Sequence, residues 1–141
     1  MNKPIVLDTG PLARISHPRR NPDAVAWLQR LLTSGDEIIV PEIADYEVRR
    51  ELLRADKTQG LARLDQLKLL LIYLPIDTPT MLRAAELWAE ARKRGLPTAD
   101  PKELDADVIL AAQAERAGGV VATENVGHLS RFVEAKAWRE I

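Results

Sequence analysis

Apolar residues along this chain occur in two spacings, short continuous runs and stripes with helical periodicity. Four short runs rich in branched or bulky apolar side chains predict buried strands, at 4–7, 37–40, 70–76 and 120–122. Stripes of helical spacing predict helices between them, at about 22–34, 43–55, 58–68, 78–94 and 104–117. Strands separated by helices favour a parallel sheet covered on both faces. The pattern therefore predicts an α/β fold, a three-layer α/β/α domain with a mainly parallel central sheet that occupies residues 1–141.

The expected helix ends carry their own signals. Asn21-Pro22-Asp23 and Thr78-Pro79 each combine a capping residue with a proline in the first helical turn. Gly35, Gly95 and the pair Gly118-Gly119 follow the expected last turns, where glycine favours termination. Thr9-Gly10-Pro11 is expected to break the first strand, and residues 96–102 are expected to form a loop.

Composition limits the function classes. The chain has 141 residues, 46% of them apolar, which is enough for a hydrophobic core. It has no cysteine, its longest apolar run (69–74) is too short to span a membrane, and its N-terminus lacks signal-peptide architecture. We therefore expect a reduced, cytoplasmic protein without a membrane segment. The net charge of −1 gives no electrostatic argument for nucleic-acid binding, and clusters such as Arg19-Arg20 are interpreted as solvated loops and helix ends.

Asp8 is the first candidate for chemistry. It directly follows the first predicted strand, and open α/β sheets bind ligands at the carboxyl ends of their strands. Its side chain is therefore expected to point into that crevice. The adjacent Thr9 either hydrogen-bonds the same site or caps the following turn.

Asp107 is the second candidate. Its neighbours at i+3, i+4 and i+7 are Leu110, Ala111 and Ala114, so it lies at the edge of an apolar helix face, where a carboxylate needs compensation. Asp105 falls on the polar side of the same helix, and Glu103 is interpreted as an acid of the helix cap.

Glu47 and the two histidines give weaker signals. Glu47 shares a helix face with Arg50, Glu51 and Arg54, which by itself favours a solvated, ion-paired surface. The chain's two histidines cannot build a multi-histidine zinc site. The sequence also contains no phosphate-binding glycine loop, dinucleotide fingerprint or nucleophile elbow.

Four segments in this order, spread over nearly the whole chain, resemble the PIN-domain nucleases, and especially the VapC-type toxins of toxin–antitoxin pairs. They are Ile5-Val6-Leu7-Asp8-Thr9-Gly10, Glu42-Ile43-Ala44-Asp45-Tyr46-Glu47-Val48-Arg49-Arg50-Glu51-Leu52, Leu104-Asp105-Ala106-Asp107-Val108-Ile109-Leu110-Ala111-Ala112-Gln113-Ala114 and Val121-Ala122-Thr123-Glu124-Asn125-Val126-Gly127-His128-Leu129.

The resemblance implies a set of site residues. The family's acidic positions fall on Asp8, Glu47 and Asp107, which would act in catalysis and hold the metal, and Thr123 matches a hydroxyl residue beside the site. The fourth acidic position is Asn125, which either holds a metal-bound water or shapes the loop. Asp105 is an alternative fourth ligand, although its helix geometry argues against it.

The resemblance also implies a function. Oxygen ligands suit Mg²⁺ or Mn²⁺, which activate water for attack on a phosphodiester. We therefore expect a divalent-metal-dependent endoribonuclease acting on single-stranded or structured RNA, the toxin of a toxin–antitoxin pair. Its expected partners are the RNA substrate, a small cognate antitoxin and a second copy of itself in a homodimer.

Two alternative functions share features with this sequence. A phosphatase of the haloacid-dehalogenase type also places an Asp after a strand, but it requires a second Asp two residues later, where this chain has Gly10. A PIN-like scaffold that binds RNA or a protein without cutting stays open, because Asn125 departs from the acidic pattern.

Overall fold

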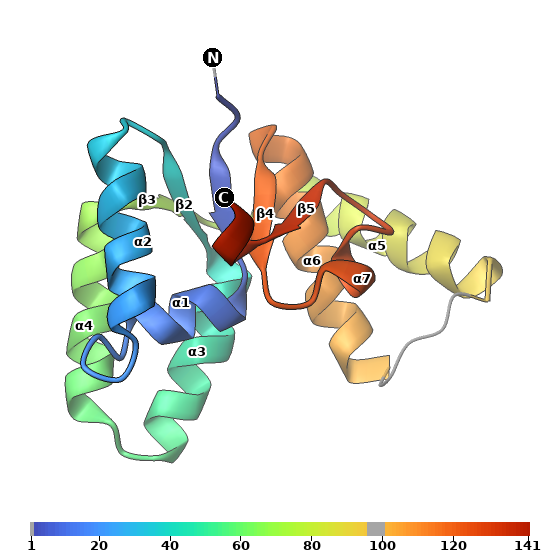
Figure 1. The fold of residues 1–141 in the computed structure, drawn as a ribbon. Coiled ribbons are helices and arrows are strands. Elements are labelled where there is room, and N and C mark those ends of the chain that lie inside the picture. Colours follow the sequence, from blue (N-terminus) through green and yellow to red (C-terminus); the bar gives the residue numbers. More distant parts are fainter. Residues whose placement is uncertain (1, 96–100) are drawn as a thin grey trace.

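A computed structural model describes residues 2–95 and 101–141, side chains included except for 101–103. In these residues five strands form one sheet in the order β3-β2-β1-β4-β5, with parallel pairings throughout (Figure 1). The strands are β1 (Ile5–Leu7), β2 (Ile38–Pro41), β3 (Ile72–Leu74), β4 (Val120–Thr123) and β5 (Ala135–Ala137). The predicted α/β class and parallel sheet are confirmed.

The predicted helices are present, with shifts of a few residues at their ends. The helical elements are α1 (Thr9–Ile15), α2 (Pro22–Thr33), α3 (Glu42–Arg54), α4 (Thr58–Leu70), α5 (Thr78–Lys93), α6 (Pro101–Ala117), α7 (Val126–Leu129) and the 3-10 helix η1 (Trp138–Glu140). Of the predicted loop at 96–102, residues 101 and 102 belong to α6, and 96–100 lie outside the described residues. The predicted third strand is shorter, because Leu70 still ends α4.

Helix α1 was not predicted, because Gly10-Pro11 suggested only a strand break. Pro11 lies in the first turn of α1. The N–H groups of that turn have no partner within the helix, so a proline there removes no helical hydrogen bond. The strand β5 and the short helix α7 were also missed. The Ala-Lys-Ala sequence of β5 carries no apolar run that would indicate a strand.

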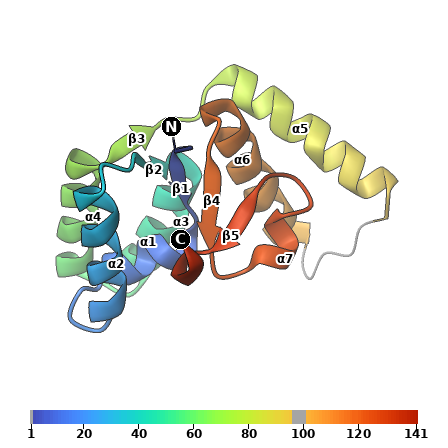
Figure 2. The ribbon, with the colours of Figure 1, turned by 45° about the horizontal axis from the view of Figure 1, so that its top comes forward.

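Alternate residues of the central strands supply two separate cores. Ile5 and Leu7 of β1 pack in one core with residues of α1, α2, α3 and α4, whereas Val6 packs in the other with residues of α6 and α7. Both sets are buried, which is the arrangement expected of parallel strands covered on both faces. Helix α5 packs along α6 on the second side (Figures 1 and 2). The three-layer α/β/α architecture is confirmed.

A buried glutamine fixes α6 against the sheet. The Gln113 side chain is 1% exposed; its amide oxygen accepts from the Ile43 N–H (3.3 Å), and its amide nitrogen donates to the Leu74 carbonyl (2.8 Å). These two bonds join α6 to the start of α3 and to the end of β3. The rotation and height of α6, and with them the position of Asp107, are thereby set.

A membrane-spanning helix would need more length and apolar character than any helix within 2–95 and 101–141 has.

Candidate active site

The sheet reverses its strand order between β1 and β4. From β1 the chain builds outward to β2 and β3 on one side, and β4 and β5 lie on the other. The carboxyl ends of the strands at such a reversal form the usual ligand crevice of open α/β sheets. Asp8 follows β1 and Thr123 ends β4, and the buried Thr123 hydroxyl donates to Asp8 Oδ2 at 2.6 Å. The predicted placement of Asp8 in this crevice is therefore observed.

Asp8 and Thr9 together start helix α1. Asp8 is its N-cap, and Asp8 Oδ1 accepts from the Thr9 N–H at 2.7 Å. The Thr9 hydroxyl donates to Glu47 Oε1 of α3 at 2.8 Å. The helix is therefore capped by Asp8 and not by Thr9. The Thr9 hydroxyl instead joins the start of α1 to Glu47.

Glu47 is less exposed than its helix face predicted. Its side chain is 23% exposed, and Arg50 Nη2 lies 3.6 Å from Glu47 Oε2. The predicted ion pairing is present, and the position is partly rather than fully solvated. Helix α1 packs against α3, which brings Thr9 over Glu47 and reduces its access to water.

Asp107 lies on α6, half-buried as its helix face predicted. Leu110, Ala111 and Ala114 are buried, and Asp105 is exposed. Asp107 lies ten residues before Ala117, the end of α6, which gives about 15 Å at a rise of ~1.5 Å per residue. Strand β4, which follows α6 in the chain, spans about 13 Å at ~3.3 Å per residue. From these lengths we expect Asp107 near the level of the carboxyl ends of the strands, where Asp8 is found. The side chain of Glu103, predicted to be a cap acid, lies outside the described residues.

Asn125 reaches the site through its backbone. Its N–H donates to the Thr123 hydroxyl oxygen at 2.9 Å, while the residue itself is exposed at the start of α7. Thr123 therefore accepts from Asn125 and donates to Asp8. These contacts give Asn125 a part in shaping the loop. A role for its side-chain amide stays a prediction.

Glu124 and Arg14 also lie at this end of the sheet, although neither was predicted from the sequence. Glu124 directly follows β4, and Arg14 of α1 donates to its carboxylate and to Asn21 Oδ1. A Cβ atom on Gly10 would lie 3.0 Å from the Glu124 carboxyl carbon, so glycine at this position gives Glu124 room beside α1. The strand-end rule that selected Asp8 would have pointed to Thr123, because the predicted strand ended at 122; only the observed end of β4 at Thr123 makes Glu124 the next residue.

Electrostatics separates Asp8 from an ordinary surface carboxylate. Burial raises the pKa of Asp8, and the negative charge of Glu124 adds to the rise; hydrogen bonds from Thr123 and Thr9 offset part of it. The charged form of Asp8 is therefore disfavoured unless a cation compensates.

Comparison with known proteins places this site in a family. The family model described as "PIN domain" matches residues 5–132, which includes all of the residues above. The chain belongs to the PIN domain family. A search of curated proteins found no match.

Solved structures agree with this PIN fold. FitAcB from Neisseria gonorrhoeae superposes with a TM-score of 0.76 at 25% identity, covering 97% of this chain and 99% of the other. VapBC-1 from nontypeable Haemophilus influenzae gives a TM-score of 0.73 at 17% identity (96% and 98% covered). VapBC2 from Rickettsia felis, bound to a DNA fragment from its promoter, gives 0.71 at 19% identity (94% and 96% covered). The last two similarities show the fold alone.

Hydrogen bonds connect Asp8, Thr9, Glu47 and Thr123 of this PIN domain. In the described part of the chain, no three His, Cys, Asp or Glu side chains are arranged so that they could hold a metal ion. Asp8, Glu47 and Asp107 thus do not form a closed ligand set in this structure.

The raised pKa of Asp8 predicts a stability difference in the absence of metal. At about pH 7, with EDTA present, Asp8→Asn should melt at a higher temperature than the wild type. The folded pKa lies above the ordinary value of 3.8, so ionisation of Asp8 lowers the free energy of unfolding as the pH rises from that value through the folded pKa. The advantage of the variant should shrink as the pH falls through this window. Melting curves of both proteins from about pH 3 to pH 7 measure it, and a difference independent of pH would contradict the prediction.

Proposed function

We propose that this PIN domain is a divalent-metal-dependent endoribonuclease that hydrolyses phosphodiester bonds of single-stranded or structured RNA. The observation that supports this most directly is the hydrogen-bonded set of Asp8, Thr9, Glu47 and Thr123 where the sheet reverses. It presents carboxylate oxygens held in fixed positions at the usual ligand crevice of an open α/β sheet.

The donor set fits Mg²⁺ or Mn²⁺. All candidate ligands are oxygen donors, and burial disfavours the charge of Asp8 without a compensating cation. Asp8, Glu47 and Asp107 would hold the ion, with Asn125 as the fourth contributor. When bound, the ion supplies acidification of water and stabilisation of negative charge at the phosphate. Thr123 and Thr9 hold the Asp8 and Glu47 carboxylates in position.

The chemistry of the products tests this proposal. Water activated at a metal attacks phosphorus directly, so the RNA 2′-hydroxyl is not needed as nucleophile. We expect cleavage in Mg²⁺ or Mn²⁺, no cleavage in excess EDTA, and products with a 5′-phosphate and a 3′-hydroxyl. End-labelling and mass spectrometry of the fragments measure this. A 2′,3′-cyclic phosphate, or cleavage that persists in EDTA, would exclude the mechanism.

One observation supports a second candidate, a scaffold that binds RNA or a protein without cutting. The described residues hold no closed set of three metal-binding side chains, and the fourth family position is an amide. Purified protein that binds RNA but cuts none of a broad RNA pool at millimolar Mg²⁺ or Mn²⁺ would favour this candidate over the nuclease.

The proposed biological role is that of a cytoplasmic toxin with a small cognate antitoxin, acting as a homodimer. Support comes from the similarity to FitAcB over 97% of the chain and from the VapBC neighbours, which share the fold. We expect expression of the chain alone to slow bacterial growth, and co-expression of the protein encoded beside it to restore growth. Sedimentation analysis tests the dimer. Unimpaired growth with a chain that is active in vitro would exclude the toxin role.

A further inference from the structure

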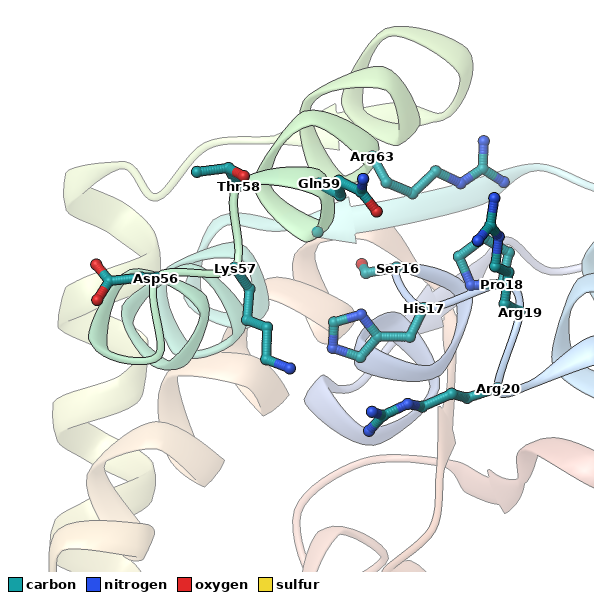
Figure 3. Close-up of a pocket in the computed structure, with 11 residues that line it drawn as sticks. Ser16, His17, Pro18, Arg19, Arg20, Asp56, Lys57, Thr58, Gln59 and Arg63 are labelled. Atoms are coloured by element: carbon teal, nitrogen blue, oxygen red, sulfur yellow. The ribbon is translucent and has the colours of Figure 1, made fainter.

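A basic hollow lies away from the acidic site, between the loop that follows α1 and the start of α4. It has a volume of ≈ 450 Å³, and the residues that line it come from 16–20 and 56–63. Figure 3 shows its side chains: Lys57 extends toward the His17 ring and Arg20. A volume of this size is large enough for a nucleotide unit.

The charge of this hollow is one-sided. Its lining includes four cationic side chains, those of Arg19, Arg20, Lys57 and Arg63, together with the His17 ring. It includes a single carboxylate, Asp56, which points away from the others in Figure 3. Across residues 2–95 and 104–141, no carboxylate lies within ion-pair distance of the three arginines or Lys57. Because the whole chain has a net charge of −1, this local excess of cations is not a consequence of composition. Arg19 and Arg20 are exposed, as the sequence predicted, but they are gathered with other cations.

Contacts on two sides fix the loop that lines the hollow. A Cβ atom on the buried Gly60 would lie 3.1 Å from His17 Cε1 and 2.7 Å from Leu52 Cδ2, so glycine lets the histidine ring lie against α4. The Asn21 side chain donates to the His17 carbonyl and accepts from Arg14, which also contacts Glu124. The loop is thereby connected to the end of β4, beside Asp8.

Helix α1 sets the distance between the hollow and the acidic site. Asp8 caps its first turn, and Ser16, which lines the hollow, caps its last. Eight residues at ~1.5 Å each give about 12 Å. A fully stacked strand advances ~3.4 Å per nucleotide along its axis, and an extended strand advances further, so this distance corresponds to at most about four nucleotides.

We propose that this hollow binds a backbone phosphate of the RNA strand, within about four nucleotides of the bond cut beside Asp8. The inference rests on the proposed function and names a second contact of the same substrate. Arginine forks match the geometry of phosphate oxygens, and Lys57 adds a point charge. Helix α4 begins at Thr58, and its N-cap residue Lys57 makes no side-chain cap, so the first N–H groups of the helix add donors on the same side.

A binding experiment tests the contact without cleavage. RNA affinity is measured by fluorescence anisotropy against salt concentration in the Asp8→Asn background. Adding Arg19→Ala/Arg20→Ala should weaken binding about tenfold and lower the slope of log K against log salt by about 0.7, the value for one lost phosphate contact on a single strand. Asp56→Asn should strengthen binding, because it removes the one carboxylate; asparagine also tolerates the φ of +53° at this position.

Lys93→Ala/Arg94→Ala is the matched control. It removes the same number of charges from the end of α5, away from the hollow (Figure 1). It should leave affinity and slope within twofold of the parent. Equal losses in the two double variants would overturn the proposal. It would also be overturned if poly-glutamate, but not RNA, bound in a manner that depends on Arg19 and Arg20.

A cleavage experiment locates the phosphate. In the enzyme with Asp8 intact, the phosphates within about four nucleotides of the cut are replaced one at a time with an uncharged methylphosphonate, and replacing one of them should slow cleavage several-fold. The same replacement should have little effect in Arg19→Ala/Arg20→Ala. An intact enzyme that cuts no RNA contradicts the proposed function. An enzyme that cuts RNA equally well with and without the two arginines contradicts the hollow alone.

Discussion

Asp8→Asn and Asp107→Asn are each expected to reduce RNA cleavage by about a thousandfold or more while the protein stays folded. A bound metal contributes several kcal/mol of charge stabilisation in the transition state, and about 1.4 kcal/mol corresponds to a factor of ten in rate. Asparagine at position 8 still has an oxygen that can accept from the Thr9 N–H, so the start of α1 should be retained. Single-turnover cleavage of a labelled RNA in Mg²⁺ measures the loss, and melting curves establish that each variant is folded.

Asp105→Asn is the matched control for Asp107→Asn. The two aspartates lie two residues apart on α6, so the chemical change is identical, but Asp105 is exposed and Asp107 is half-buried. Cleavage by Asp105→Asn should stay within a few-fold of wild type. Near-normal activity of either Asp8→Asn or Asp107→Asn would show that the site is assigned wrongly. A loss with Asp105→Asn as large as that with Asp107→Asn would make Asp105 the missing ligand.

Glu47→Gln should reduce cleavage as Asp8→Asn does, because Glu47 accepts from Thr9 at the same site.

Gly119→Ala is expected to have the largest effect on stability, lowering the free energy of unfolding by about 3 kcal/mol, the upper end for overpacking of a close-packed site. An added Cβ would lie 2.7 Å from Val6 Cγ2 and 2.8 Å from the Pro4 carbonyl oxygen. That oxygen accepts the Val120 N–H at 2.9 Å, so relief of the clash requires the β1–β4 pairing to shift. Chemical denaturation measures the change.

Gly127→Ala makes the same chemical change in open space. An added Cβ there meets nothing within 4 Å, so stability should change by less than about 1 kcal/mol. Because β1 and β4 carry Asp8 and Thr123, folded Gly119→Ala should also cut RNA more slowly than Gly127→Ala. Equal stability of the two variants would contradict the prediction, because it would mean that the β1–β4 pairing accommodates the added Cβ at little cost in free energy.

Local patterns were sufficient for much of this fold. Continuous apolar runs predicted four of the five strands, because a strand covered on both faces needs apolar side chains on both sides. Proline and glycine signals placed most helix ends close to those observed, since they act within a few residues along the chain. The same local logic failed at Pro11, where the signal of a strand break also permits a helix start, and at β5, an edge strand with no apolar run.

The sequence by itself therefore determined the class of the fold, the position of Asp8 after the first strand and the half-buried face of Asp107. Periodicity described Glu47 only from the residues of its own helix. The packing of α1 on α3 brought Thr9 against it, and no pattern within α3 could predict that. Tertiary structure likewise joined Thr123 to Asp8 across 115 positions of the chain. It also gathered Arg19 and Arg20 with Lys57 and Arg63 around one hollow. Such contacts depend on strand order and on how helices pack. A pattern along one element indicates only which side of that element faces the core.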